Sequence, residues 1–212
     1  MYMRKLQHKP GNGSGLLAIF CDLASVDQAD FRPWLIEDMF PARQKIGFKD
    51  CASFNLIDGK GSEFVTLYET PSIGHLYDLP YQNLRQTRNP RDKNYHNKFQ
   101  SPQRYTLNWV GPEISKKING FSKYIMISRF DLKDWLIPDF NIWFVCTYIP
   151  SLLNTKNIVG LRRFISLEGP HKNFVIKEIL KPQKSDVDNL GPENKKFETY
   201  ITGTYERIIQ IP

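Results

Sequence analysis

The chain contains 212 residues, of which 41% are hydrophobic and 13% aromatic, enough to bury a substantial core in one large domain or two smaller ones. Its three cysteines are an odd number without a CxxC pair, which excludes a disulfide framework and indicates no metal site. A reducing cytoplasm fits this usage best. The net charge of +7 raises the question of a polyanionic partner.

Residues 1–14 combine basic side chains with a glycine-rich run and lack the apolar region of a signal peptide, so we expect a flexible leader. No continuous apolar run approaches the roughly 20 residues that a membrane helix needs. The sequence therefore predicts a soluble protein without a membrane partner.

The stretch 30–48, DFRPWLIEDMFPARQKIGF, recurs later in the chain. Three of its residues return 109 positions further along: Asp30, Trp34 and Pro41 recur as Asp139, Trp143 and Pro150. Self-similarity of this kind indicates a repeated structural unit. We therefore interpret the chain as two copies of one unit, at residues 15–112 and 121–212.

The first copy begins with an almost continuous apolar strand at 16–21. A helix is expected from Asp30, because Pro33 then falls in its first turn, where a missing N–H carries no cost, and Pro41 bends or ends the helix. The remaining elements are strands at 51–57, 63–69 and 104–110, and a second helix from Ser72 to about residue 84.

The second copy repeats this order. Its predicted elements are strands at 124–130, 161–167, 174–180 and 195–209, a main helix at 139–153 and a weakly signalled second helix within 182–192. Each copy is interpreted as a ferredoxin-like βαββαβ unit, with helices on one face of an antiparallel sheet. Exposing the aromatic residues of the other face would be costly, so the two sheets are expected to face each other about a pseudo-two-fold axis. The predicted fold class is α+β.

The segment DFRPWLIEDMFPAR followed by IGF resembles the signature DFNxWYxxEHLPxR followed by PGF of the dimeric α+β-barrel superfamily, most closely its EthD-like branch. The resemblance implies two tandem ferredoxin-like units that form an intramolecular dimeric α+β barrel. Members include cofactor-free monooxygenases, polyketide cyclases, lactone isomerases and some haem proteins. They typically bind small hydrophobic molecules between a sheet face and these helices.

The chain departs from this signature at the histidine. Met39 occupies that position in the first copy and cannot exchange a proton, whereas Tyr148 occupies it in the second and can donate a hydrogen bond to an oxyanion. Asp38 and His75 are the other candidate catalytic groups, each as a proton carrier. For all three candidates the alternative is a structural or solvated residue.

Four residues are candidates for contacting a substrate: Trp34, Met39, Arg43 and Trp143. Arg43 is suited to hold an anion or enolate, and the two tryptophans are suited to form an apolar pocket wall or, alternatively, part of the core. The sequence predicts one dominant pocket lined by Trp143 and Tyr148 or by their first-copy counterparts. The two half-sites need not be equivalent.

The segment 85–104 concentrates basic, amide and aromatic residues, but its prolines, asparagines and lack of periodicity predict a solvated loop. No helix-turn-helix or RNP-like strand accompanies it, so nucleic-acid binding is not expected. The sequence leaves open whether the protein forms a homo-oligomer.

Two functional hypotheses follow. The first is a cofactor-independent enzyme that enolises, cyclises or oxygenates a mostly apolar carbonyl or phenolic metabolite. The second is a non-catalytic member of the fold that binds a small molecule or a protein. No histidine is distinguished as an axial haem ligand, so no cofactor is predicted.

Overall fold

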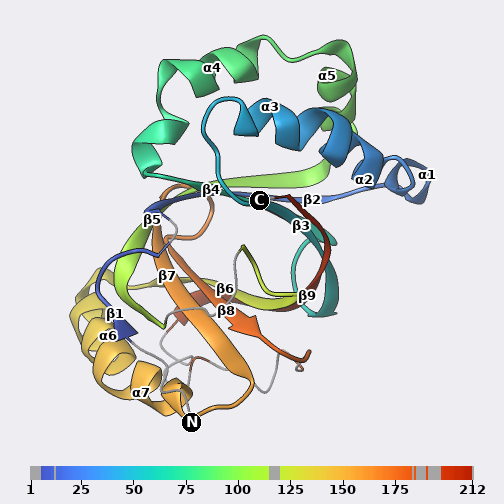
Figure 1. Cartoon of the computed structure of the whole chain (residues 1–212). Coiled ribbons are helices and arrows are strands. Elements are labelled where there is room, and N and C mark those ends of the chain that lie inside the picture. Colours follow the sequence, from blue (N-terminus) through green and yellow to red (C-terminus); the bar gives the residue numbers. More distant parts are fainter. Residues whose placement is uncertain are drawn as a thin grey trace.

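The computed structural model describes residues 6–11, 13–114, 120–182, 184, 190 and 197–211. Eight antiparallel strands close into a barrel in the order β5-β2-β4-β3-β9-β6-β8-β7, and β7 pairs back with β5 (Figure 1). The strands are β1 (Leu6–Gln7), β2 (Gly15–Asp22), β3 (Cys51–Gly59), β4 (Phe64–Thr70), β5 (Gln100–Ile114), β6 (Tyr124–Leu132), β7 (Ile158–Glu168), β8 (Asn173–Ile179) and β9 (Phe197–Ile211). The short β1 adds to β5 outside the barrel.

Helices cover the barrel on two sides, with α1 to α5 on one side and α6 and α7 on the other (Figure 1). The first group comprises α1 (Ser25–Gln28), α2 (Phe31–Trp34), the π-helical η1 (Leu35–Met39), α3 (Phe40–Gln44), the 3-10 helix η2 (Ile73–Leu76), α4 (Leu79–Gln86) and α5 (Pro90–His96). The second comprises the 3-10 helix η3 (Asp134–Leu136), α6 (Ile137–Trp143), the π-helical η4 (Phe144–Tyr148) and α7 (Ile149–Leu153).

Side-chain alternation divides the core into layers. Leu16, Ala18 and Phe20 of β2 belong to the barrel interior, whereas Leu17 and Cys21 pack with the helices outside. The interior cluster draws residues from both halves of the chain and fills the barrel with apolar and aromatic side chains. The expectation of an α+β barrel is confirmed: β3 pairs with β9 and β5 with β7, so the sheets of the two halves join into one closed sheet.

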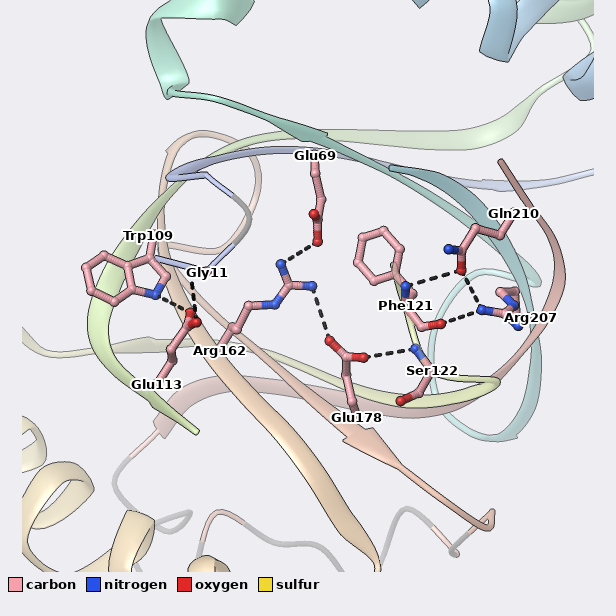
Figure 2. Close-up of polar contacts among 10 residues, drawn as sticks. All are labelled: Gly11, Glu69, Trp109, Glu113, Phe121, Ser122, Arg162, Glu178, Arg207 and Gln210. Carbon is pink, nitrogen blue, oxygen red and sulfur yellow. Dashed lines mark hydrogen bonds and ion pairs between the residues drawn. The ribbon is translucent and has the colours of Figure 1, made fainter. Parts of the chain in front are cut away.

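A buried polar cluster lies inside the barrel, and Figure 2 shows its contacts. Arg162 of β7 donates to Glu69 of β4 across 2.5 Å and to Glu178 of β8 across 3.4 Å. Beside it, Glu113 accepts hydrogen bonds from the Trp109 indole at 2.9 Å and from a backbone N–H at 3.0 Å. The Arg162–Glu69 ion pair joins the two halves of the chain across the barrel.

The prolines in the two main helices do not end them. Pro41 lies in α3 and Pro150 in α7, each just after a π-helical segment. In that segment the Phe40 N–H bonds to the Leu35 carbonyl, and the Ile149 N–H to the Phe144 carbonyl, one residue further back than in an α-helix. The widened turn relieves the clash that proline causes in a regular helix, so each helix continues.

Several boundaries differ from the sequence-based expectation. Part of the expected leader, Leu6–Gln7, forms β1 against β5, and a single helical turn forms at Ser25–Gln28. The segment 85–104 contains α5 and is a folded element rather than a solvated loop. The expected helix within 182–192 falls mostly outside the described residues.

One described stretch, Asp134–Leu153, is long and apolar enough to cross a membrane by length and composition, which the sequence reading overlooked. It covers η3, α6, η4 and α7, and its Phe140, Phe144 and Ile149 are buried with the outer face of the barrel. A helix packed on a soluble core passes the same test, so this stretch gives no strong sign of a membrane location.

Candidate functional site

A cavity of about 350 Å³ lies between the barrel wall and the helices of the first half. Its floor comes from β2 and β5, and its walls from α3, α4 and α5 and the residues that join them. The polar part of the lining consists of Arg43, Tyr81, Arg85, Arg88, His96, Gln103 and Arg104, and the apolar part of Ile19, Phe99 and Pro102. The lining of the cavity therefore combines several cationic groups with an apolar surface.

Helix α5 brings two ionisable groups to this cavity. Asn89 caps it by accepting a 2.7 Å hydrogen bond from the Asp92 N–H, and Pro90 occupies the first turn, where no N–H partner is needed. Asp92 and His96 then lie one turn apart on the same face. On another face Tyr95 stacks on Trp34, with ring centroids 4.4 Å apart and planes 9° apart, which anchors α5 to the main helix.

Asp92 and His96 form a contacting pair. His96 Nδ1 lies 2.8 Å from the backbone carbonyl of Asp92 and 3.2 Å from its carboxylate. Burial would raise the pKa of Asp92, but His96, Arg43 and Arg88 together hold that pKa below its ordinary value. The carboxylate thus stays charged. The backbone carbonyl of Asp92 can only accept, so it fixes the Nδ1–H of the imidazole toward Asp92 and leaves Nε2 as the nitrogen that can accept a proton.

The arginines of the cavity are held in different ways. Arg43 is only 4% exposed, its guanidinium lies 4.8 Å from the centre of the Tyr68 ring, and it donates to the Met39 carbonyl at 3.2 Å. Arg104 pairs with Glu168 of the second half. Within the described part of the chain, the buried Nε atoms of Arg43 and Arg104 have no hydrogen-bond acceptor. Both Nε atoms are shielded from solvent, so what these two side chains offer to a bound anion is the positive charge of their guanidinium groups.

Arg88 lies between α4 and α5, with its Nε 3.7 Å from the Asp92 carboxylate. Burial lowers the pKa of its guanidinium, and the charge of Asp92 opposes this shift. A guanidinium remains protonated under ordinary conditions, so Arg88 is a permanent positive charge beside His96. The arginines of this arrangement can bind an anion, and His96 can accept a proton from the bound molecule.

Of the residues singled out from the sequence, Arg43 lines this cavity. Asp38 instead accepts from Arg91 at 2.7 Å and from Asn89 at 2.9 Å on the outer side of α5. Trp34 is fully buried in the core, and Met39 is buried with its sulfur in contact with Arg43. These three lie beside the cavity and support its walls.

The other three lie elsewhere. Tyr148 is buried in the second half, where its ring stacks on Trp143 at 5.1 Å between centroids and its hydroxyl accepts from Lys177 at 2.9 Å. Burial raises the pKa of the Tyr148 phenol, so this hydroxyl is neutral at physiological pH. His75 lies in η2 with its ring against Gly47. The structure brings neither His75 nor Tyr148 into the arginine-lined cavity.

His96, Arg88 and Tyr81 were not predicted from the sequence as residues of the site. A signal for His96 was present, because Asn89 and Pro90 are typical of a helix start and Asp92 and His96 are four residues apart. The direction in which this helix faces depends on the packing of Tyr95, which the sequence does not reveal.

No protein-family model and no curated protein sequence matches the chain. Solved structures do match. An anthrone oxidase-like protein superposes with a TM-score of 0.64 at 7% identity over 98% of this chain and 96% of its own. The "putative monooxygenase" of Lactobacillus acidophilus NCFM gives 0.59 at 12% identity over 93% and 95%.

A mutant chlorite dismutase from Candidatus Nitrospira defluvii gives 0.56 at 8% identity, over 93% of each chain. These neighbours belong to the dimeric α+β-barrel superfamily. The chain has their fold. At such identities the likeness establishes the barrel and its helices, and the chemistry must be argued from the residues of this chain.

Proposed function

We propose that this protein is an enzyme of small-molecule metabolism that transfers a proton in the arginine-lined cavity. The observation that carries the proposal is the Asp92–His96 pair on the wall of that cavity, beside Arg88. The substrate is a carbonyl- or phenol-bearing metabolite. The reaction is an enolisation, or a cyclisation or oxygenation that starts from the same anion, and the scheme uses no cofactor.

The proposed step is a general-base reaction. Asp92 holds the proton of the neutral imidazole on Nδ1, and His96 Nε2 accepts a proton from the carbon next to a carbonyl or from a phenol. The electron pair of the broken C–H or O–H bond moves onto the substrate and is shared with its oxygen. Arg88 or Arg43 binds the resulting oxyanion, which stabilises the transition state electrostatically. An oxygenation then consumes dioxygen as a co-substrate.

We also propose that the barrel arose by tandem duplication of a ferredoxin-like unit, and that its nearest branch is EthD-like. The strand orders β5-β2-β4-β3 and β9-β6-β8-β7 are the same when each half is numbered separately. The π-helical segments Leu35–Met39 and Phe144–Tyr148 also lie 109 positions apart. Such a shared irregularity supports common descent of the halves.

The alternative is a binding protein without catalysis. The specific observation that favours it is the loss of the signature histidine from both halves, as Met39 and Tyr148. In that alternative His96 is a wall residue and the arginines only hold the ligand. If the protein is an enzyme, Asp38, Tyr148 and His75 remain predictions as catalytic groups.

Deuterium exchange distinguishes the two. The purified protein is incubated in deuterated buffer with a panel of small carbonyl and phenolic compounds that includes anthrone, and solvent exchange is followed by NMR together with oxygen uptake. We expect acceleration for at least one compound and a loss of roughly 10²- to 10⁴-fold in His96→Gln. His8→Gln, at an exposed histidine outside the cavity, is the matched control and should keep full activity. Equal rates in His96→Gln and the wild type would exclude the proposed base.

A further inference from the structure

The charge of the cavity lining is not balanced within the protein. Four guanidinium groups line it, from Arg43, Arg85, Arg88 and Arg104. In the described part of the chain, the carboxylates that pair with them are Asp92, which faces Arg88, and Glu168, which faces Arg104. Four cations against two carboxylates leave an excess of two positive charges.

Burial makes the charge of Arg43 expensive unless an anion joins it. Arg43 is 4% exposed, and in the described residues its cation contacts the Tyr68 ring and the Met39 carbonyl and sulfur without a carboxylate in ion-pair range. A buried cation without a counter-ion destabilises the fold unless it serves a ligand. A guanidinium recognises the oxygens of a carboxylate, sulfonate or phosphate through charge-assisted hydrogen bonds, so a group of this kind is the anion that Arg43 and the neighbouring arginines would hold.

The apolar part of the lining determines the rest of the ligand. Ile19, Phe99 and Pro102 give an apolar surface, and Tyr81 adds an aromatic ring. The volume of about 350 Å³ is at the lower end of ordinary small-molecule pockets, which span about 300–1,000 Å³. It accommodates a molecule of two or three rings and is too small for a folded polymer segment.

We infer that the ligand of this cavity is a small aromatic or otherwise apolar molecule that carries a separate anionic group, held by Arg43, Arg85, Arg88 and Arg104. This inference rests on the proposed function in that it uses the same cavity, and it replaces the mostly apolar ligand expected from the sequence with an organic anion. The anionic group fixes the molecule at the arginines and presents its reacting part to His96. The arginines concentrated in segment 85–104 thus serve a small anion.

A matched pair of probes tests the ligand class. 8-Anilinonaphthalene-1-sulfonate and N-phenyl-1-naphthylamine share the same rings and differ by one sulfonate, and both report binding by fluorescence. The double variant Arg85→Gln/Arg88→Gln should weaken binding of the sulfonate roughly 10- to 100-fold, because it removes two charged partners. Binding of the uncharged probe should change less than about twofold, because the apolar wall is intact.

The controls separate charge selectivity from damage to the fold. Arg32→Gln removes the same charge from an exposed site on α2 and should leave both probes unaffected. Arg85→Gln alone, at an exposed residue whose guanidinium contacts Gln82 at 3.4 Å, serves if the double variant fails to fold. Equal loss of both probes, no loss of either, or no binding of the sulfonate by the wild type would overturn the inference.

The outcomes for ligand class and for catalysis are distinguishable. Charge-selective binding without deuterium exchange would keep the ligand class and remove the proposed catalysis. Deuterium exchange that depends on His96, without charge-selective binding, would keep the proposed catalysis and remove the proposed ligand class. Displacement of the sulfonate probe is also measured with inorganic phosphate at millimolar concentration and with benzoate. If phosphate displaces the probe with the same affinity as benzoate, the rings do not contribute to binding and the inference is overturned.

Discussion

Lys177 donates a hydrogen bond to the Tyr148 hydroxyl across 2.9 Å, and both side chains are buried between β8 and η4 in the second half of the chain. Burial lowers the pKa of the Lys177 ammonium from 10.5 to about 7. The same burial raises the pKa of the Tyr148 phenol. A neutral amine beside a neutral phenol is therefore the favoured form at mildly basic pH.

This pair makes folding stability depend on pH. Between about pH 7 and 10.5 the unfolded chain keeps a proton on Lys177 that the folded chain releases, so the free energy of unfolding rises with pH in that window. Lys177→Met removes this dependence, and its stability relative to wild type should fall by on the order of 3 kcal/mol from about pH 7 to about pH 9. Urea denaturation at several pH values measures this. Lys172→Gln, at an exposed lysine, should follow the wild type, and a pH-independent difference for Lys177→Met would refute the assignment.

Tyr95 is the main aromatic anchor of helix α5, since its ring contacts those of Trp34 and Phe31. Tyr95 is 2% exposed and stacks on Trp34, so Tyr95→Ala should lower the free energy of unfolding by about 3–5 kcal/mol. Tyr95→Phe keeps the stack and loses only the hydrogen bond from its hydroxyl to the Asp27 carbonyl, at a cost of about 1 kcal/mol. Chemical denaturation measures both values. A loss below about 1 kcal/mol for Tyr95→Ala would mean that α5 is held by other contacts.

The buried ion cluster of Figure 2 should be sensitive to loss of its cation. Burial disfavours the charge on Arg162, but Glu69 and Glu178 outweigh it and raise the pKa of the guanidinium. Arg162→Met leaves two buried carboxylates without this partner and should destabilise the protein by about 3–5 kcal/mol at neutral pH.

Replacing the carboxylates as well provides the control for this cluster. Glu69→Gln and Glu178→Gln, added to Arg162→Met, remove the uncompensated charges and should recover most of the lost stability. If the triple variant is no more stable than the single one, the cluster acts by packing rather than by charge.

The three cysteines should differ in reactivity. Burial raises the pKa of the Cys21 and Cys51 thiols to about 12, and both side chains are inaccessible, whereas Cys146 is exposed on η4. A thiol reagent such as DTNB should therefore modify one cysteine rapidly in the native protein and three after denaturation. Cys146→Ser should abolish the rapid phase. Rapid modification of a second cysteine would show that the helices packed over Cys21 and Cys51 open in the native protein.

The sequence predicted the strands better than the helices. Apolar alternation and turn residues placed the strand expected at 51–57 within Cys51–Gly59, because alternation reports directly which face is buried. Helix α5 escaped because it has only seven residues, and so short a helix is stable only through tertiary contacts such as that of Tyr95. The π-helical segments were also not predicted, since a proline indicates a bend in a helix but not which backbone hydrogen bonds change around it.

The candidate site was only partly predictable. Arg43 was identified because it belongs to a recognisable segment whose helix packs on the sheet. His96 was set aside, because a histidine in a basic, proline-containing stretch is usually exposed. Its role here depends on Asp92 one turn earlier and on the arginines of α4 and β5, which come together only in three dimensions.

The most direct test of this account is the side-chain NMR spectrum of the four histidines during titration with 8-anilinonaphthalene-1-sulfonate, with the His96 resonance assigned from His96→Gln. His96 lines the cavity, whereas His75 lies against Gly47 and His171 contacts Tyr105 inside the barrel. The account predicts that His96 alone shifts progressively and saturates with the fluorescence change. A ligand that shifts His171 or His75 and leaves His96 unmoved would show that the cavity of the first half is not the binding site.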